Sequence, residues 1–304
     1  MAKFNIAKIV THSFLGMVQK CLREGIPWQT PFIRTGIPIS AATGDIYSGI
    51  NVFQLLMSSY INEFTDPRWG TYNRWKTLGG QVKKGSRSTM AIYYKLMPYE
   101  ITNEKTGETV EAARPLMRYY SLFNAEQCNG IEPLETEETS PARRFKVADK
   151  YLNSAGADVT FSTQPPFYNY KKDYINLLHA ELYKDTKHAT ATESFYSSWT
   201  HELTHWTGAK DRNNRPMKGD KYSDEYAYEE LIAEFGAILL CNKLDITLEP
   251  TLANATYLAS WIKRLKKDDH ALMRATRQAQ KAVDYIDQQV NLDTQVQPTG
   301  DNNE

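Results

Sequence analysis

The chain has 304 residues, with 36 Lys and Arg against 36 Asp and Glu, so its formal net charge is zero. Its length indicates about two domains, and 41% hydrophobic residues suffice for a buried core. No apolar run approaches the ~18 residues of a membrane span, and three scattered cysteines, Cys21, Cys128 and Cys241, provide no disulfide framework. We therefore expect a cytoplasmic protein with no membrane contact.

The first part of the chain mixes helix and strand patterns. Apolar residues at helical spacing precede Gly25 and Pro27, which are typical of a helix C-terminus. The predicted elements are a helix at 4–24, a helix at 52–61, strands at 90–99 and 116–123, and a turn at 103–107 between the strands. Residues 1–131 are thus expected to form an α+β domain.

An acidic segment without aromatic residues, 132–140, predicts a linker. Ser140 and Pro141 then supply an N-cap and a first helical residue. The predicted elements of the second domain, 141–290, are helices at 141–153, 194–207, 223–244, 251–265 and 271–289 and strands at 158–161 and 174–178. Residues 291–304 are expected to be a disordered acidic tail. The predicted fold class is α+β with two domains, of which the second is mainly helical with a small sheet.

The strongest chemical motif is the run His-Glu-Leu-Thr-His at 201–205. On a helix, His201 and His205 lie one turn apart and face the same way, so two imidazoles can hold one Zn²⁺. Glu202 then points beside them, toward a water whose pKa the metal lowers, and is the predicted catalytic base.

A tetrahedral site needs a third protein ligand, and two adjacent acids are available some 25 residues after His205. Helical spacing favours Glu230, because Glu234 follows one turn later and could accept the free ring N–H of a ligand histidine. Glu229 points about 100° away from Glu230 and stays open as the alternative ligand. The ligand set suits Zn²⁺, with another divalent metal such as Mn²⁺ as the alternative.

A second feature is a basic stretch from Asp66 to Lys95, in which seven cations oppose one acid and aromatic residues are interleaved. Cations can follow a phosphate backbone while aromatic rings stack on unpaired bases. The pattern is typical of a binder of single-stranded nucleic acid, although a solvated basic face beside core aromatics would look the same. The candidate contact residues are Arg68, Trp69, Arg74, Trp75, Lys76, Lys83, Lys84 and Arg87.

Ordered blocks of sequence carry a family resemblance across nearly the whole chain. They are Ile26–Gln29, Tyr47–Val52, Asp66–Tyr72, Gly79–Gly85, Tyr120–Gln127, His201–Gly208 and Glu229–Glu234. On these blocks the chain resembles the ArdC-type antirestriction proteins of conjugative plasmids, which are related to the N-terminal part of TraC-type primases.

The resemblance implies an N-terminal single-stranded-DNA-binding domain followed by a zincin-like metallopeptidase domain. It also implies protection of incoming conjugative DNA from the recipient's restriction enzymes. The family's metal motif falls on His201, His205 and the pair Glu229-Glu230, with Glu202 as the catalytic carboxylate. A host restriction-modification protein is a possible peptidase substrate.

Two other functions remain open from the sequence. One is a metallopeptidase whose basic stretch has no role in DNA binding. The other is a protein that coats single-stranded DNA and carries a structural, catalytically dormant metal site.

The zero net charge conceals an uneven distribution. Residues 1–134 carry 15 basic and 10 acidic side chains, a net of +5, and residues 135–304 carry 21 and 26, a net of −5. The expected DNA-binding half is therefore basic and the enzyme-like half acidic, which suggests that the two sites serve different ligands.

Overall fold

The structure of the protein is a computed structural model that describes residues 5–32, 36–102, 109–134, 140–216, 223–248 and 254–296. A four-stranded sheet lies near one end of the molecule. Its strands are β1 (Ile39–Ser40), β2 (Arg68–Thr71), β4 (Thr89–Thr102) and β5 (Thr109–Asn124). The order is β1-β2-β5-β4, with β1 parallel to β2 and the remaining pairs antiparallel.

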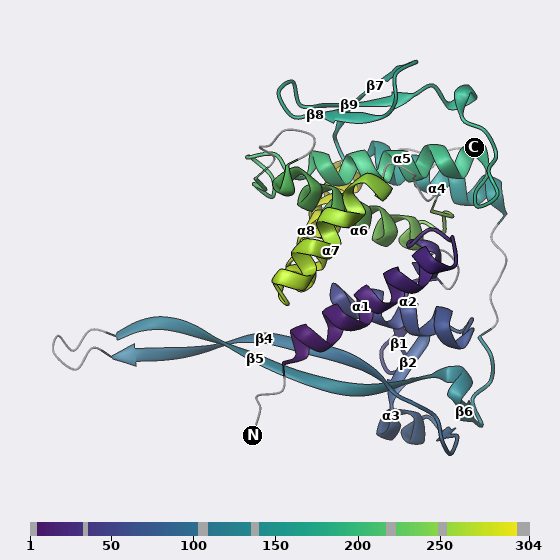
Figure 1. Cartoon of the computed structure of the whole chain (residues 1–304), viewed down its shortest axis with the longest axis vertical. Coiled ribbons are helices and arrows are strands. Elements are labelled where there is room, and N and C mark those ends of the chain that lie inside the picture. The colour runs from purple at the N-terminus through teal and green to yellow at the C-terminus, as the bar shows by residue number, and fades with distance from the viewer. Residues whose placement is uncertain are drawn as a thin grey trace.

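Strands β4 and β5 form a long two-stranded arm. They pair in register from Thr89–Leu122 to Thr102–Thr109, and their outer part projects well beyond the body of the molecule (Figure 1). Both strands were predicted and are confirmed, with longer bounds than the sequence indicated. The predicted turn at 103–107 lies outside the described residues.

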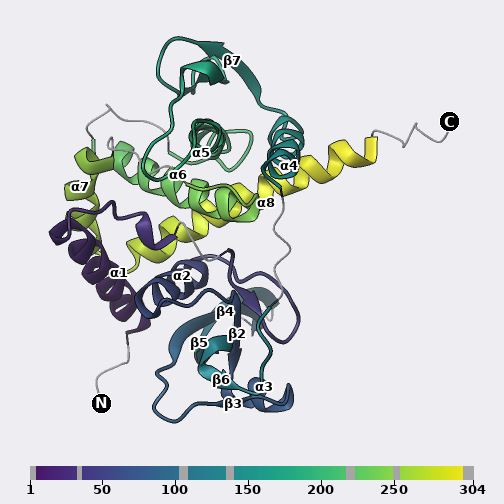
Figure 2. The same ribbon diagram turned by 90° about the vertical axis from the view of Figure 1, so that its right-hand side faces the viewer.

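Helices and short elements on both sides of the sheet complete the first half. Helices α1 (Ile6–Arg23) and α2 (Ile50–Asn62), both of which were predicted, lie on one side of the sheet, and α2 packs on β4 (Figure 2). On the other side lie α3 (Tyr72–Thr77), the two-stranded sheet β3 (Gln81–Val82) and β6 (Cys128–Asn129), and the 3₁₀ turn η2 (Ala125–Gln127), while η1 (Thr30–Phe32) follows α1. These short elements were not predicted from the sequence, because they are too short to show a measurable period.

The second half is mainly helical. Its helices are α4 (Pro141–Asn153), α5 (Ala191–Trp206), α6 (Asp224–Lys243), α7 (Asn254–Lys267) and α8 (Ala271–Val296). A sheet of order β7-β9-β8 packs beside α5 and is built from β7 (Asp158–Ser162), β8 (Phe167–Asn169) and β9 (Tyr174–Leu178), with the turn η3 (Ala180–Leu182) after it. The expected helices and small sheet are therefore present.

One prediction for the C-terminus is wrong. Residues 291–296 were expected to be disordered, but α8 continues through Val296. The apolar side of α8, including Ala279, Val283 and Ile286, is buried against the rest of the protein, and its helical pattern extends into the polar end. Residues 297–304 lie outside the described residues, as do 135–139 of the expected linker and the first three residues of the helix predicted at 251–265.

A single hydrophobic core joins the two halves. The Phe235 ring of α6 lies 5.8 Å from Phe14, 6.1 Å from Trp28 and 4.5 Å from Phe53, all three from the first half of the chain. Trp28 also lies 5.7 Å from Trp261 of α7. The contacts with Phe14 and Trp28 are edge-on and that with Phe53 is tilted, and aromatic contacts of this kind add to the stabilisation from area burial. The sequence division near residue 131 is thus not a division of the core.

Within the described residues, no helix is long and apolar enough to cross a membrane.

Candidate metal centre and nucleic-acid surface

Helix α5 carries the two histidines, and its start is fixed by a reciprocal cap. The Thr190 hydroxyl accepts from the Glu193 backbone N–H at 3.2 Å, and the Glu193 carboxylate accepts from the Thr190 N–H at 3.0 Å. Such a capping box satisfies two of the free N–H groups at a helix start. The helix then extends through Trp206, which places His201 and His205 on one side of it.

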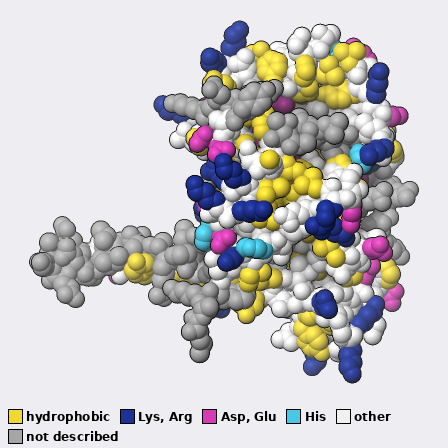
Figure 3. Space-filling view, viewed as in Figure 1, with side chains coloured by type: hydrophobic (Ala, Val, Ile, Leu, Met, Phe, Trp, Pro, Cys, Tyr) yellow, Lys and Arg dark blue, Asp and Glu magenta, His cyan; other side chains and the backbone are white. Residues whose placement is uncertain are grey.

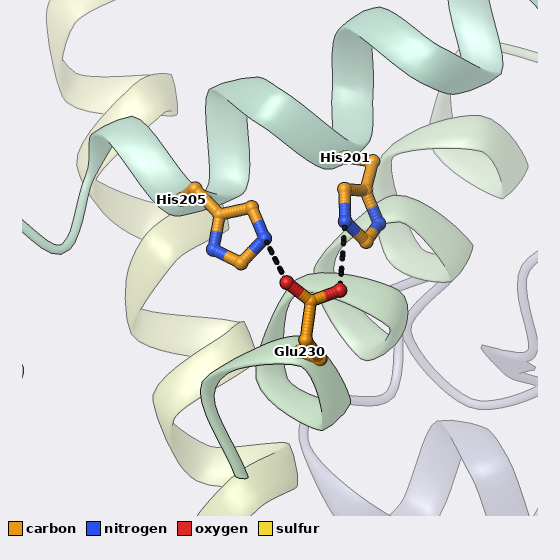
Figure 4. Close-up of side chains that lie close together, drawn as sticks. All are labelled: His201, His205 and Glu230. Atoms are coloured by element: carbon orange, nitrogen blue, oxygen red, sulfur yellow. Dashed lines mark ion pairs between the residues drawn. The ribbon is translucent and has the colours of Figure 1, made fainter. Parts of the chain in front are cut away.

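Helix α6 brings Glu230 between the two imidazoles (Figure 4). The His201 Nε2 lies 3.6 Å from one Glu230 oxygen, and the His205 Nε2 lies 3.4 Å from the other. One donor atom from each of the three residues lies within 4.8 Å of the others. The structure therefore brings together the three residues that the sequence nominated as metal ligands.

These two distances end on different oxygens of Glu230, and each is near the ligand spacing around a zinc ion. Ligand atoms ~2.1 Å from a tetrahedral zinc are roughly 3.4 Å apart, close to both nitrogen–oxygen distances. Two imidazoles and one carboxylate also leave a fourth position open, as in catalytic rather than structural zinc sites. The same donors accept manganese, a metal of more oxygen-rich sites, so the set fits several divalent cations.

Each histidine is oriented from behind by its own carboxylate. Nδ1 of His201 lies 3.2 Å from Glu234, and Nδ1 of His205 lies 3.2 Å from Glu229. A hydrogen bond from Nδ1–H fixes the tautomer and turns Nε2 toward the metal position. Glu234 thus has the position predicted for it, and Glu229, which the sequence left open as a ligand, instead faces the far side of His205.

Arg215 is a component of the site that the sequence analysis missed. Its guanidinium donates to Glu229 at 2.6 and 2.9 Å and also to the Thr204 carbonyl at 2.7 Å. Arg215 is almost fully buried, and it neutralises Glu229 while contacting the C-terminal turn of α5. No periodic pattern marks Arg215, because it lies in the loop between α5 and α6.

Gln29, also missed, reaches the site from the first half of the chain. Its side-chain Nε2 donates to Glu234 at 3.4 Å, and both side chains are buried. The orientation of His201 therefore depends, through Glu234, on a residue that lies 205 positions before that carboxylate.

The two histidines favour the protonated state when the three residues face one another without a cation. Burial lowers the pKa of His201, but the hydrogen bonds that the ring donates to Glu230 and Glu234 outweigh it and raise the pKa well above the usual value. For His205, burial likewise opposes the effect of Glu229 and Glu230, which raise the pKa to about 9. A divalent cation would replace these protons and satisfy the same carboxylates.

Glu202 lies beside the histidines with its side chain buried. Burial raises the pKa of its carboxyl group, although His201 and His205 counteract part of that effect. A carboxylate with a raised pKa is a better proton acceptor near neutral pH, which suits a general base.

The site opens into a cleft of about 740 Å³. The cleft is lined on one side by the residues around β8 and on the other by α5 and α6, and most of its other lining is aromatic or apolar. Among the lining residues are Phe167, Tyr168, Tyr170, Tyr183, Tyr226 and Tyr257. Apolar walls around a few converging polar groups are typical of substrate sites.

The separation of α5 and α6 is set by Gly236. A Cβ atom at this position would lie 2.3 Å from the Thr204 Cγ2 and 2.4 Å from its Oγ1, so only glycine fits. Thr204 is buried and donates to the Thr200 carbonyl, which fixes its side chain. This close approach lets Glu230 reach between the histidines.

The candidate DNA-contact residues differ in their exposure to solvent. The exposed members are Arg74, Lys76, Lys83, Lys84 and Arg87. Arg68 is partly buried and paired with Asp66 at 2.6 Å, and it donates to the Glu132 carbonyl. Its guanidinium thus already has partners within the protein.

For Trp69 and Trp75, the expectation of stacking on bases is wrong. Their relative exposures are 0% and 1%, because Trp69 packs with Leu55, Ala91 and Leu122, and the Trp75 indole donates to the Phe123 carbonyl at 2.9 Å. Trp69 faces the core from β2 and Trp75 is buried on α3, so neither indole offers a face to a ligand.

Comparison with protein families gives two matches along the chain. The model of the N-terminal domain of anti-restriction factor ArdC matches residues 5–123, and that of a zincin-like metallopeptidase matches residues 146–278. Among curated proteins, the uncharacterized protein y4eC of Sinorhizobium fredii is 28% identical over 264 residues, which cover 86% of this chain and 84% of that protein.

A DNA primase TraC of Escherichia coli is 32% identical over 274 residues. The match includes 86% of this chain but only 25% of the primase, so the chain spans about a quarter of that relative's length.

Two crystal structures of the antirestriction ArdC protein from plasmid R388 have a similar fold. The metal-free structure superposes with a TM-score of 0.72 at 31% identity, covering 95% of this chain and 99% of that one. The Mn(II)-bound structure gives a TM-score of 0.71 at 28% identity, with 94% and 98% covered.

Proposed function

Because the chain belongs to the ArdC family of antirestriction proteins, we propose that it protects incoming plasmid DNA from restriction by combining single-stranded-DNA binding with a metal-dependent peptidase site. The observation that carries the peptidase half is the convergence of His201, His205 and Glu230 below Glu202 in one cleft. We assign the first three as ligands of Zn²⁺ or Mn²⁺ and Glu202 as the catalytic carboxylate.

His201, His205 and Glu230 would hold a divalent cation, which would supply polarisation of a peptide carbonyl and a lowered pKa for a neighbouring water. Glu202 accepts a proton from that water as the oxygen attacks the carbonyl carbon. The same carboxyl group then donates the proton to the amide nitrogen as the carbon–nitrogen bond breaks. Glu234 and Glu229 hold the histidine rings in place throughout, and the cleft walls limit the access of bulk water.

The observation that carries the DNA-binding half is the group of exposed cations on α3 and between β3 and β4. Arg74, Lys76, Lys83, Lys84 and Arg87 are exposed, and none of them forms an ion pair with another described residue. Figure 3 shows Lys and Arg side chains gathered at the end of the body where Figure 1 places α3. The Lys83 ammonium donates to the Glu126 carbonyl at 2.8 Å, but no carboxylate of the described residues neutralises its charge. Exposed cations release counterions when they bind phosphates, which gives a strong dependence of affinity on salt.

The test is transfer of an unmodified plasmid into a restricting recipient that already contains the protein, together with metal analysis of the purified protein. We expect Glu202→Gln to retain one bound cation and lose protection. We expect Lys83→Ala/Lys84→Ala to lose protection and salt-dependent DNA binding, whereas the matched pair Lys171→Ala/Lys172→Ala, exposed in the second half, keeps both.

The outcomes separate the alternatives. If Glu202→Gln keeps both its metal and its protection, the protein protects DNA by coating it, and the metal is structural. If Lys83→Ala/Lys84→Ala keeps full protection and DNA binding, the protein is a peptidase whose basic residues have no DNA-binding role. The proposed peptidase substrate is a host restriction-modification protein, which the same strains can test by following its cleavage.

A further inference from the structure

The burial of Trp69 and Trp75 removes the aromatic groups that were expected to stack on bases. We propose that unpaired bases stack instead on one face of the β4–β5 arm, here called the arm face and made of Tyr93, Tyr99, Arg118 and Tyr120. This inference rests on the proposed function, since it locates the site of the single-stranded DNA.

The strand register places these four residues on the same face. Tyr93 is directly opposite Arg118, and Ala91 is directly opposite Tyr120. Opposed residues of an antiparallel pair share a face, as do residues two or six apart along a strand. The rings of Tyr93 and Tyr120 meet at 6.3 Å and 84°, so they form a connected aromatic surface.

The arm face begins as core and becomes exposed along the arm. At its root, Ala91 and Leu122 are buried against Leu55 of α2. Tyr120, directly opposite Ala91, and Tyr93, two residues farther along β4, are each 42% exposed. Large aromatic side chains exposed in a row on one face are typical of a binding surface rather than of solvent-facing positions.

The charge near the arm favours a polyanion as the occupant. Strand β4 begins two residues after Arg87, so the exposed cations Lys83, Lys84 and Arg87 lie at the root of the arm. Arg118 adds an exposed cation on the arm face itself. A phosphate backbone can therefore contact the root while its bases lie against the tyrosines. Only unpaired bases expose their rings in this way, which specifies a single strand.

The experiment measures binding of a fluorescent oligothymidylate of about 20 nucleotides, longer than a typical single-strand site, to the full chain at several salt concentrations. We expect Tyr93→Ala/Tyr120→Ala to weaken binding by roughly 10-fold to 100-fold without changing the salt dependence, because ring stacking involves no phosphate. Tyr93→Phe/Tyr120→Phe keeps the rings and should bind as the wild type does. Arg118→Ala should reduce the slope of log affinity against log salt by roughly 0.7, the share of one phosphate.

Tyr119→Ala is the matched control. Tyr119 neighbours Tyr120 and is 54% exposed, but it is on the opposite face of the arm, so its loss should leave affinity near the wild-type value. Thermal unfolding of all variants checks that the fold is intact.

Equal binding by Tyr93→Ala/Tyr120→Ala and wild type would overturn the inference and leave the proposed function standing. A wild type without salt-sensitive binding would instead overturn the DNA half of the proposed function. If the double variant lost protection while keeping its DNA affinity, the arm face would be a protein-docking surface and the inference would be wrong.

Discussion

Arg215 and Glu229 form a buried two-point ion pair directly behind His205. Both side chains are nearly inaccessible to solvent, so each buried charge is compensated by the opposite charge of the other. The pair couples the loop after α5 to the first turns of α6, and through Glu229 it fixes the orientation of a candidate metal ligand.

Removal of Arg215 should therefore destabilise the protein and weaken the metal site together. We expect Arg215→Ala to lower the free energy of unfolding by about 3–5 kcal/mol, since it leaves the Glu229 carboxylate buried without a cation. Chemical denaturation measures the loss. The double variant Arg215→Met/Glu229→Gln removes both charges and should recover much of the stability; a double variant as unstable as the single one would contradict this account.

Glu234 gives a prediction for metal affinity alone. We expect Glu234→Ala to weaken metal binding by about 10-fold to 100-fold, because the ring of His201 loses the acceptor at its Nδ1. Calorimetric titration with Mn²⁺ measures the change. Glu225→Ala removes an exposed acid from the same helix and is the control. An equal loss in both variants would point to overall charge rather than to the position of Glu234.

Gly236 gives a prediction for the packing of α5 on α6. Gly236→Ala should destabilise the protein by about 1–3 kcal/mol, because the new methyl group overlaps Thr204 and the helices must separate. Thr204→Ala in the same chain should restore part of the loss. Gly16→Ala is the matched control, since that helical glycine has open space around it and the change should be neutral or stabilising. Thermal unfolding compares the variants.

The metal-free protein should lose stability at alkaline pH. The pKa of His205 is raised to about 9 in the fold against a usual value of ~6.5, so its contribution is complete below pH ~6.5. That contribution disappears as the pH rises through about 9, when the imidazole loses its proton beside Glu229 and Glu230.

Unfolding temperatures in the presence of a chelator, measured between pH 6 and pH 9.5, test this expectation. His205→Gln should reduce the decline with pH. A metal-free protein with the same profile as that variant would refute the assignment. Metal binding should in turn release protons and strengthen as the pH rises, because the cation competes with them for the same nitrogens.

The helical repeat explains how much of the site could be predicted from the sequence. A spacing of four places His201 beside His205 and Glu230 beside Glu234, and both helices are long enough for that period to be visible. Arg215 and Gln29 escaped prediction because each reaches the site from outside those helices, by contacts that no local pattern encodes.

The base-stacking residues in the basic, aromatic stretch were predicted wrongly for a different reason. Composition identifies cations and rings but not the side of a strand on which each lies, and Trp69 faces the core while the neighbouring Arg68 reaches the surface. The pairing of β4 with β5 brings in Arg118 and Tyr120, which lie well beyond the stretch in sequence. Surfaces that form by strand pairing are visible only in the fold.

The aromatic cluster around Phe235 also bears on which part of the chain can fold alone. Cutting the chain between its two halves would expose the rings of Phe14, Trp28 and Phe53 on one piece and Phe235 on the other. The smallest unit expected to fold is therefore the pair of halves. The similarity to the far longer E. coli TraC primase spans both halves, since it includes 86% of this chain.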